Sequence, residues 1–433
     1  MTPSARLSAA IEVFSDIEAR RRPAADALKE WGLAHRYAGS GDRAAIAGLV
    51  YDALRRKSSS AWLMGEASAR AALIGMLRRE RGLDAAAIAA LCSGARYAPE
   101  PLTETEKTAL AADTVADAPP HVAGDYPEWL DPNLARVFGD ERAAEGAALS
   151  SRAPLDLRVN TLVATRDDVL PKLAHLGAEA ARWSPAGLRV RLGADAKSPA
   201  IHAEPAFLKG QIEIQDEGSQ LAALLAGAKP GEQVIDLCAG AGGKTLALAA
   251  AMENRGQIYA TDSDKRRLVP IHERIARSGA RDIQVRTPKS VGDVLADLAG
   301  RIDLVLIDAP CTGTGIWRRN PDAKWRIRPG ALAVRLGEQE AVLERAVPLI
   351  RPGGRIAYVT CSVLAEENGD QVRAFAGRHP NFSVEKPGNV ITALGERAYL
   401  FGRAVLISDE GLLMTPRRSD TDGFFVSLLR RSA

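Results

Sequence analysis

Apolar residues in the first quarter of the chain follow a helical spacing. Over residues 6–110 they recur every three or four positions, as at Ile46 and Val50, and strand-like alternation is nearly absent. This spacing predicts four to six packed helices. Residues 103–126 are rich in Ala, Asp, Thr and Pro, a composition typical of a linker. We therefore expect an all-α domain over residues 1–125.

The middle of the chain changes to short strands separated by a helix. Residues 155–160 and 188–192 have the apolar character of strands, and the helix between them has Thr165 as its N-cap and Gly177 as its C-cap. This order predicts a small α+β module. Together with the helical stretch that precedes it, the module is assigned to residues 126–215.

Short apolar runs alternate with helical stretches through the last half of the chain. The runs predict buried parallel strands, and their alternation with helices predicts an α/β domain with a doubly wound sheet. The ligand of such a sheet binds at the carboxyl ends of the strands. We assign this domain to residues 216–433, with residues 423–429 as an antiparallel edge strand. The four parallel strands are expected at residues 234–237, 257–261, 304–307 and 355–359.

Composition excludes several classes of protein. The 57 Lys and Arg residues against 54 Asp and Glu give a net charge of only +3, so any nucleic-acid surface must be a local patch. Four scattered cysteines suit neither a disulfide framework nor a zinc site, so we expect reduced thiols and no metal. Residues 1–20 lack an apolar signal segment and no run is long enough to cross a membrane, which predicts a cytoplasmic protein.

Three arginine-rich clusters lie in the helical part, at residues 20–22, 55–57 and 78–81. Such clusters on helices are most often solvated surface, and the alternative is a patch that faces RNA. The sequence leaves both interpretations open.

A glycine-rich turn, Asp-Leu-Cys-Ala-Gly-Ala-Gly-Gly-Lys-Thr, follows the first parallel strand at residues 236–245. A Walker A loop would need a glycine in place of Cys238, and a dinucleotide fingerprint would need one in place of Thr245. A turn that only packs is a third alternative. The pattern favours a ligand over the turn that is not a phosphate, with Asp262 after the second strand accepting hydrogen bonds from a ribose. S-adenosylmethionine fits both features.

Cysteines follow two further strands. Cys311 lies in Asp-Ala-Pro-Cys-Thr-Gly-Thr-Gly at residues 308–315, and Cys361 lies in Thr-Cys-Ser at residues 360–362. A buried cysteine alone usually only packs, but both of these strand ends open into one crevice. Carbon 5 of cytosine becomes a competent nucleophile when a thiolate adds to carbon 6, and a second thiol or a base then helps the elimination. Asp308 could stabilise the charge that develops on the base.

Together these motifs are specific. Over about residues 118–430 the chain resembles the bacterial RNA cytosine-5 methyltransferases of the RsmB/Sun type. The resemblance rests on the glycine-rich turn, on the Pro-Cys run with its continuation Arg318-Arg319-Asn320-Pro321, and on Thr-Cys-Ser. Residues before about 110 resemble, more weakly, the NusB-like helical domain of this family. The resemblance implies a Rossmann-like class I methyltransferase domain preceded by a small α+β module and an all-α NusB-like domain.

The resemblance also implies roles for individual residues. Cys361 would be the nucleophile, Cys311 would assist release of the methylated product, and Asp308 would lie near the methionine end of the cofactor. The residues implied to bind S-adenosyl-L-methionine are Cys238, Ala239, Gly240, Ala241, Gly242, Gly243, Lys244, Asp262 and Asp308.

Two positions depart from the family pattern. Ala241 stands where the family usually has proline, which should loosen the turn without removing a contacting group. The family commonly has an acid after the third strand for adenine, whereas residues 285–288 are Val-Arg-Thr-Pro. Backbone groups or Thr287 would then contact the adenine.

The segment after Cys311 is rich in groups that bind RNA, because Arg and Lys attract phosphates and Trp can stack on an unpaired base. Trp317 and Trp325 suit a core equally well, and Arg158 and Asn160 in the α+β module are secondary candidates. The target cytosine would be flipped out or single-stranded. The RNA-binding candidates are Arg318, Arg319, Lys324, Trp325, Arg326 and Arg328.

The sequence therefore predicts a monomeric, S-adenosylmethionine-dependent methyltransferase acting on cytosine 5 of 16S ribosomal RNA, the substrate that the helical domain implies by resemblance. A catalytically impaired RNA-binding or assembly protein is one alternative. A cytosine-5 methyltransferase of transfer RNA or 23S ribosomal RNA is another.

Overall fold

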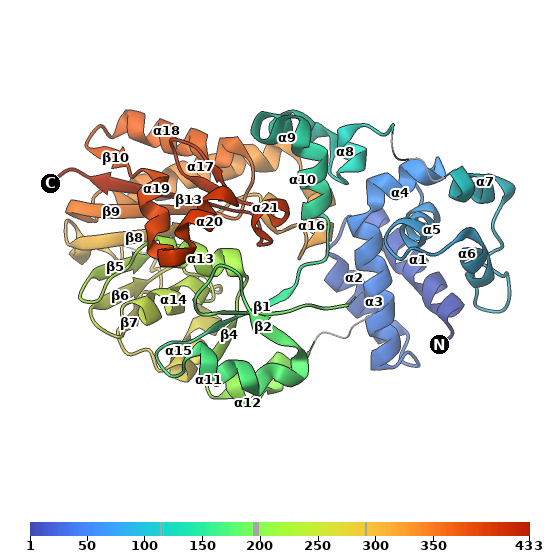
Figure 1. Ribbon diagram of the computed structural model, residues 1–433, viewed down its shortest axis with the longest axis horizontal. Helices are drawn as coiled ribbons and strands as arrows, with labels where there is room; N and C mark the ends of the chain where they lie inside the picture. Colours follow the sequence, from blue (N-terminus) through green and yellow to red (C-terminus); the bar gives the residue numbers. More distant parts are fainter. Residues whose placement is uncertain (113–114, 116, 194–198, 291) are drawn as a thin grey trace. The chain divides into compact units, whose positions relative to one another are not determined.

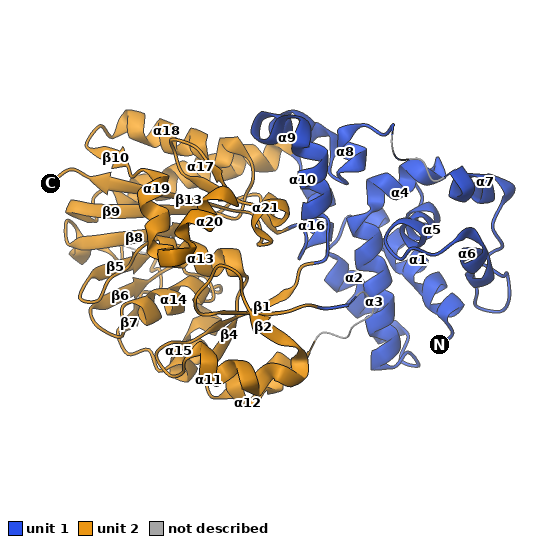
Figure 2. Cartoon of the chain, viewed as in Figure 1, with its two compact units in different colours: residues 1–152, 192–197, 317–328 blue, residues 153–191, 198–316, 329–433 orange. Residues whose placement is uncertain are grey.

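The computed structural model describes residues 1–112, 115, 117–193, 199–290 and 292–433. Its contacts define two compact units (Figure 2). Unit 1 is Met1–Arg152, Leu192–Lys197 and Trp317–Arg328, and unit 2 is Ala153–Arg191, Ser198–Ile316 and Pro329–Ala433. This division differs from the domain boundaries expected at residues 125 and 215. Part of the expected linker, residues 113, 114 and 116, lies outside the described residues.

Unit 1 is helical. Its described residues up to 112 form seven α-helices, more than the four to six predicted, around one core that includes Leu7, Phe14 and Leu54. Short helical segments continue to Leu149. The helices are α1 (Pro3–Arg20), α2 (Ala24–Ala34), α3 (Ser40–Arg55), α4 (Lys57–Met64), α5 (Ala69–Arg79), α6 (Ala85–Leu91), α7 (Glu104–Ala112), α8 (Pro120–Ala123), α9 (Asp131–Phe138), α10 (Arg142–Leu149) and, from the inserted segment, α16 (Pro321–Arg326).

The arginine-rich clusters of unit 1 are largely engaged in ion pairs with acids of the same unit. Arg22 pairs with Asp16 and Glu30, and Lys57 pairs with Glu18. Asp52, which is buried, pairs with Arg55 at 3.1 Å and with Arg81 at 2.6 Å. The Asp52 pairs therefore give Arg55 and Arg81 a role in packing the helices, whereas Arg20 and Arg21 are exposed, as expected for solvated surface.

Unit 2 begins with the small α+β module. Four antiparallel strands form one sheet in the order β2-β3-β1-β4. The predicted caps of its helical segment are confirmed, because Thr165 and Asp168 form a capping box and Gly177 closes the segment in the left-handed conformation. The strands are β1 (Leu155–Val159), β2 (Ala178–Ala180), β3 (Gly187–Val190) and β4 (Ile212–Ile214), and the helices are α11 (Arg166–Val169) and α12 (Pro205–Leu208).

The rest of unit 2 is built on a nine-stranded sheet (Figure 1), ordered β11-β12-β13-β9-β8-β5-β6-β7 with β10 paired to β13. The predicted parallel strands are confirmed as β5, β6, β8 and β9, and β7 is a fifth. The strands are β5 (Gln233–Asp236), β6 (Gln257–Ala260), β7 (Ile283–Val285), β8 (Ile302–Asp308), β9 (Ile350–Thr360), β10 (Phe382–Val384), β11 (Leu406–Ile407), β12 (Leu412–Met414) and β13 (Phe424–Arg431).

The final strand, β13, is antiparallel as predicted but does not lie at an edge. It pairs with β9 on one side and with β12 and β10 on the other. Its continuous apolar run suits this interior position, because both faces of the strand are buried from Phe424 to Leu429.

The order of the parallel strands creates a switch point between β5 and β8. From β5 the chain runs outward through β6 to β7, and it then returns to β8 on the other side of β5. In open sheets a ligand binds outside the carboxyl ends of the strands at such a point. The helices of this domain are α13 (Glu217–Leu225), α14 (Gly243–Ala251), α15 (Val269–Ser278), α17 (Pro329–Ala346), α18 (Gly369–Arg378), α19 (Pro387–Val390), α20 (Ala398–Arg403) and α21 (Pro416–Ser419). Among the described helices, none is long and apolar enough to cross a membrane.

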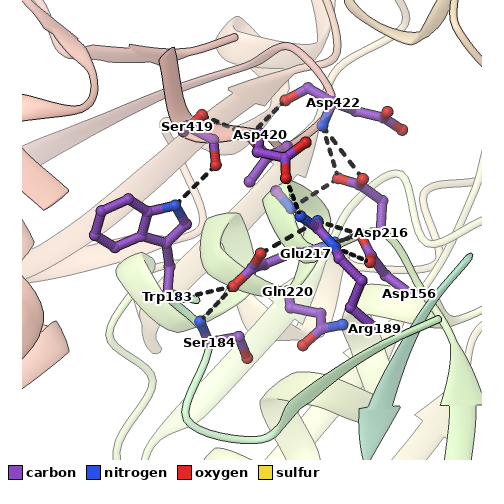
Figure 3. Close-up of polar contacts among 12 residues, drawn as sticks. Asp156, Trp183, Ser184, Arg189, Asp216, Glu217, Gln220, Ser419, Asp420 and Asp422 are labelled. Carbon is purple, nitrogen blue, oxygen red and sulfur yellow. Dashed lines mark hydrogen bonds and ion pairs between the residues drawn. The ribbon is translucent and has the colours of Figure 1, made fainter. Parts of the chain in front are cut away.

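A network of ion pairs joins the four-stranded sheet to the part of unit 2 that is built on the nine-stranded sheet (Figure 3). Arg189 of β3 donates to Asp156 of β1 at 2.7 and 2.9 Å and to Asp420 at 2.8 Å. It also pairs with Glu217, at the start of α13, at 3.3 Å. Glu217 accepts from the Ser184 backbone, and its own amide donates to Asp156. The network therefore fixes the start of α13 against both parts of unit 2.

Candidate active site

The glycine-rich turn connects β5 to α14 and needs two glycines with positive φ. Gly240 has φ +50° and Gly242 has φ +84°. A Cβ on Gly242 would lie 2.4 Å from Ile271 Cγ1, so only glycine lets α15 approach this closely. Beneath the turn, Asp236 accepts a hydrogen bond from the Thr245 hydroxyl at 2.7 Å, and burial raises the pKa of this carboxyl to about 7.

A cavity opens beside this turn at the carboxyl end of β5. Its polar walls come from the turn, from α15, and from the segment between β4 and α13. The lining residues are Ile214, Gln215, Ser219, Asp236, Cys238, Ala239, Gly240, Ala241, Gly243, Lys244, Arg267, Arg274 and Asp308. Most of the predicted cofactor residues thus meet at one cavity, as the strand order requires.

Asp262 and Gly242 are not among the lining residues. Asp262 is 1% exposed, and its Oδ2 accepts the Gly240 amide at 2.9 Å. Arg267 Nη1 approaches the same carboxyl at 3.4 Å. In this structure Asp262 therefore holds the glycine turn against the end of β6, while its contact with a ribose stays a prediction.

Neither Thr287 nor its neighbours after β7 line the cavity. Arg286 instead pairs with Asp297 and donates to the Val294 carbonyl at 2.8 Å, and its guanidinium lies 4.5 Å from the ring centre of Tyr259. Arg286, the first residue after β7, is thus engaged within its own domain.

The two predicted catalytic cysteines meet. Cys311 follows β8 and Cys361 follows β9, and their Sγ atoms lie 3.3 Å apart although 50 residues separate them in the chain. Both are free thiols of intermediate exposure. The juxtaposition follows from the sheet, since β8 and β9 are adjacent parallel strands whose carboxyl ends share one edge.

Backbone contacts lock the two cysteine loops together. The Gly315 amide donates to the Cys361 carbonyl at 2.9 Å, and the Gly423 amide donates to the Gly315 carbonyl at 2.8 Å. A Cβ on Gly315 would lie 2.2 Å from the Gly423 carbonyl oxygen, so this crossing requires glycine. Buried Glu367 accepts the Thr312 amide at 2.8 Å and a Gln339 donor at 3.1 Å. Sequence reasoning missed Glu367, because its partners lie far from it in the chain.

The two cysteines have different electrostatic surroundings. Lys244 Nζ contacts Asp308 Oδ2 at 2.7 Å, and Asp308 is half-buried. Burial lowers the pKa of Lys244, but Asp308 and Cys361 outweigh it and leave this pKa above its ordinary value. The contact with Cys361, together with burial, holds the pKa of Cys311 well above its usual range. Cys311 therefore keeps its proton, and Cys361 is one of the groups that act on the Lys244 ammonium. Burial also raises the pKa of Cys238.

Only part of the segment after Cys311 is available for the RNA surface that the sequence suggested. Arg318 and Lys324 are 2% and 0% exposed, so the prediction is wrong for these two residues. Trp317 is buried, and Trp325 donates from Nε1 to the Leu54 carbonyl at 2.6 Å. The physical reason is that the segment forms α16 and packs within helical unit 1.

Interior contacts hold this segment. Lys324 donates to Ser150 Oγ at 2.8 Å, and burial lowers its pKa to about 7. Arg55 donates to the Arg318 carbonyl at 3.1 Å. Of the remaining candidates Arg319 is half-buried, whereas Arg326 and Arg328 are exposed.

Arg158 and Asn160 are also buried, so the structure contradicts their assignment to an RNA surface. Arg158 donates to Gln215 Oε1 at 2.7 Å, and Asn160 donates to the carbonyls of Gly210 and Ser278. The physical reason is that their polar groups are hydrogen-bonded to other parts of unit 2.

The fold and the site define a class. A doubly wound sheet with a glycine-rich turn at the switch point, a carboxylate after the next strand and no P-loop is the arrangement of an S-adenosylmethionine-dependent methyltransferase. The residues fit this cofactor: the cavity offers a positive-φ turn, the Lys244 and Asp308 pair and the buried, unpartnered Oδ1 of Asp236. Among the described residues, no group of His, Cys, Asp and Glu could hold a metal.

Comparison with known proteins gives the family. The model for 16S rRNA methyltransferase RsmB/F matches residues 222–430, and that for the ferredoxin-like domain of RsmF/B-like methyltransferases matches residues 126–196. The probable ribosomal RNA small subunit methyltransferase B of Synechocystis is 30% identical over 71% of this chain and 67% of its own length. The chain belongs to the RsmB/F family of ribosomal RNA methyltransferases, whose cofactor is S-adenosylmethionine.

Solved structures agree on the fold. The structure of PH0851 has a TM-score of 0.68 and 24% identity, and covers 100% of this chain and 99% of its own. A methyltransferase homolog protein from Pyrococcus horikoshii has a TM-score of 0.58 and 26% identity, over 72% of this chain and 97% of its own. The chain spans 60% to 67% of the length of several curated relatives that it matches.

A clamp on the glycine turn was not foreseen from the sequence. Arg274 of α15 donates to the Ala241 carbonyl at 2.8 Å, and Glu213 of β4 holds its guanidinium at 2.9 Å. The clamp thus ties the small module to the position where the turn lacks proline. A charged pair in β4 and α15 was the only signal in the sequence.

We expect Arg274→Met to weaken cofactor binding about tenfold, the effect of losing one hydrogen bond of about 1.4 kcal/mol to the turn. The turnover number should change little, because Arg274 does not touch the cysteines. Arg277→Met is the matched control, since Arg277 also pairs with Glu213, whereas the hydrogen bond to the turn comes from Arg274. Calorimetric titration with S-adenosylhomocysteine measures the difference. Equal affinities of the two variants would contradict the clamp.

Proposed function

We propose that this protein transfers a methyl group from S-adenosylmethionine to carbon 5 of a cytosine in 16S ribosomal RNA, through a covalent bond between Cys361 and carbon 6. The observation that carries the proposal is the 3.3 Å approach of Cys311 and Cys361 at the carboxyl edge of the sheet. A single thiol would suffice for packing. A covalent adduct uses two thiols, because one forms the bond to the base and the other assists its release.

The surroundings support Cys361 as the nucleophile. Cys361 is one of the groups that raise the pKa of Lys244, so the two side chains interact electrostatically. Cys311 keeps its proton, so it can direct that proton toward the Cys361 sulfur. Asp308 holds Lys244 in place from the end of β8.

The proposed steps balance as follows. The Cys361 thiolate forms a bond to carbon 6 of the ring, and the electron pair of the C5–C6 double bond becomes available at carbon 5. S-adenosylmethionine, when bound, supplies a methyl group that carbon 5 can attack. The carbon 5 proton then leaves to a base, the C5–C6 double bond reforms, and Cys361 departs as a thiolate. Cys311 assists this departure.

The RNA side of the proposal rests on fewer residues than the sequence suggested. Arg326 and Arg328 are exposed in the segment that follows Cys311, and they are our candidates for phosphate contacts. The helical residues 1–125 and the α+β module, residues 126–215, are proposed to bind RNA, and residues 216–433 to carry the methyltransferase activity.

The substrate is tested by bisulfite sequencing of total RNA from cells that lack the protein. We expect one or more methylated cytosines of 16S ribosomal RNA to become unmethylated and to be restored by the wild-type gene, but not by Cys361→Ala. A change confined to transfer RNA or 23S ribosomal RNA would replace the substrate assignment. Normal methylation in every RNA would support the assembly-protein alternative.

A further inference from the structure

The two active-site thiols are placed for a reaction with each other as well as with a base. Their sulfurs lie 3.3 Å apart, and a disulfide needs about 2.05 Å, so an approach of about 1.3 Å would join them. Both side chains are partly exposed, which gives a small oxidant access.

The surrounding backbone allows this approach without unfolding the sheet. Residues 309–313 form neither helix nor strand. Asp308 at the end of β8 precedes them, and within the segment Thr312 is held by its contacts to Glu367. Cys361 lies one residue beyond β9. Rotation of the two side chains, together with a small shift of the irregular segment, can therefore close the remaining distance.

We propose that Cys311 and Cys361 form a redox-sensitive modification site, which a hydroperoxide converts to a disulfide that a dithiol reductant reverses. The disulfide itself depends only on the geometry of the pair. Its consequence, loss of methyl transfer, rests on the function proposed above, because both sulfurs needed for the adduct cycle would be consumed.

The reaction balances in two steps. The Cys361 sulfur attacks one oxygen of hydrogen peroxide, the O–O bond breaks, and the products are a sulfenic acid and one water. The Cys311 sulfur then attacks the sulfenic sulfur, its thiol proton leaves, and the S–O bond breaks to release a second water. The two thiols lose two electrons and two protons in total, and the peroxide is reduced to two waters.

The charges at the site support this order. Contact with Cys361 and burial hold the pKa of Cys311 well above its usual range, so Cys311 remains the thiol that resolves the sulfenic acid. A neighbouring thiol also protects the nucleophile, because a sulfenic acid that forms a disulfide is not oxidised further to a sulfinic acid, which dithiols do not reduce. The second cysteine would thus preserve the enzyme through oxidative exposure.

The test treats the full-length protein with a slight excess of hydrogen peroxide and measures three quantities. We expect an intact mass lower by about 2 Da, the mass of the two hydrogens lost. A peptide map should link the peptides that contain Cys311 and Cys361, and methyl transfer should fall at least tenfold and return with dithiothreitol. Cys92→Ser should behave identically, since Cys92 is buried in the helical core of unit 1.

Cys311→Ser should instead gain oxygen on Cys361 and, at higher peroxide, stop responding to dithiothreitol. If the wild-type protein gains oxygen without forming the link, the proposed site is wrong. If the wild-type protein forms the disulfide but keeps its methyl transfer, the proposed loss of activity on oxidation is wrong. If the link forms in a protein that shows no methyl transfer before treatment, the modification site holds and the proposed function fails.

Discussion

Cys361→Ala should lower methyl transfer by roughly 10⁴-fold or more, because it removes the only atom proposed to bond to the substrate. Binding of S-adenosylhomocysteine should change little, since Cys361 does not line the cofactor cavity. Transfer of radiolabelled methyl groups to 16S ribosomal RNA or to immature small subunits measures the first effect. Calorimetry measures the second.

Cys311→Ser should act differently and trap the protein on its RNA. Without the thiol that assists departure of Cys361, the methylated adduct should accumulate and migrate as a covalent complex on denaturing gels. The double variant Cys311→Ser, Cys361→Ala should form none. Cys92→Ala is the matched control, because it removes a thiol from the core of unit 1 and should leave both assays unchanged. An adduct that survives in the double variant would exclude Cys361 as the nucleophile.

Arg189→Met should destabilise unit 2 by about 3–5 kcal/mol at neutral pH, because it leaves buried carboxylates without their cation. Asp156 and Glu217 are 1% and 0% exposed, and burial already raises the pKa of each despite the contacts that oppose it. The adjacent Arg191 offers a matched control. It is 65% exposed in its pairs with Glu179 and Asp420, so Arg191→Met should cost less than about 1 kcal/mol.

The loss of unfolding free energy caused by Arg189→Met should become smaller as the pH falls. Without the guanidinium, the pKa values of Asp156 and Glu217 in the folded state rise further above those of the unfolded chain. The folded state then binds more protons than the unfolded state, and its free energy of unfolding increases toward acid pH. Urea unfolding between pH 5 and 8, with hydrogen exchange at the Ser184 amide, measures this. Equal stabilities of the two variants at every pH would show that the network does not hold unit 2 together.

Several elements of the fold follow from local patterns. The apolar runs of β5, β6, β8 and β9 predict buried strands because both faces of a central parallel strand are covered. The N-cap at Thr165 and the end at Gly177 are correct, since capping depends on neighbouring residues. The final strand, β13, was misplaced at the edge, because pairing with β9 and β12 is set by partners that a single run does not reveal.

The candidate site also has some parts that the sequence predicts and others that it does not. The glycine-rich turn and the two cysteine motifs are recognisable in the sequence because their chemistry resides in contiguous residues. The sequence does not reveal which side chains of the segment after Cys311 are exposed. Its arginine, lysine and tryptophan side chains suit an RNA surface and a helical interior equally. Only packing decided between them, and it buried Arg318 and Lys324.

The sequence by itself determined the fold class, the cofactor turn and the presence of two thiols at strand ends. The tertiary structure decided that those thiols lie 3.3 Å apart and that Arg274 donates to the turn at Ala241. It also decided that Arg189 forms ion pairs with three carboxylates. The physical reason is the range of the interactions. Periodicity, turns and caps depend on residues within a few positions, whereas these sulfur contacts and ion pairs join residues that lie 28 to 231 positions apart in the chain.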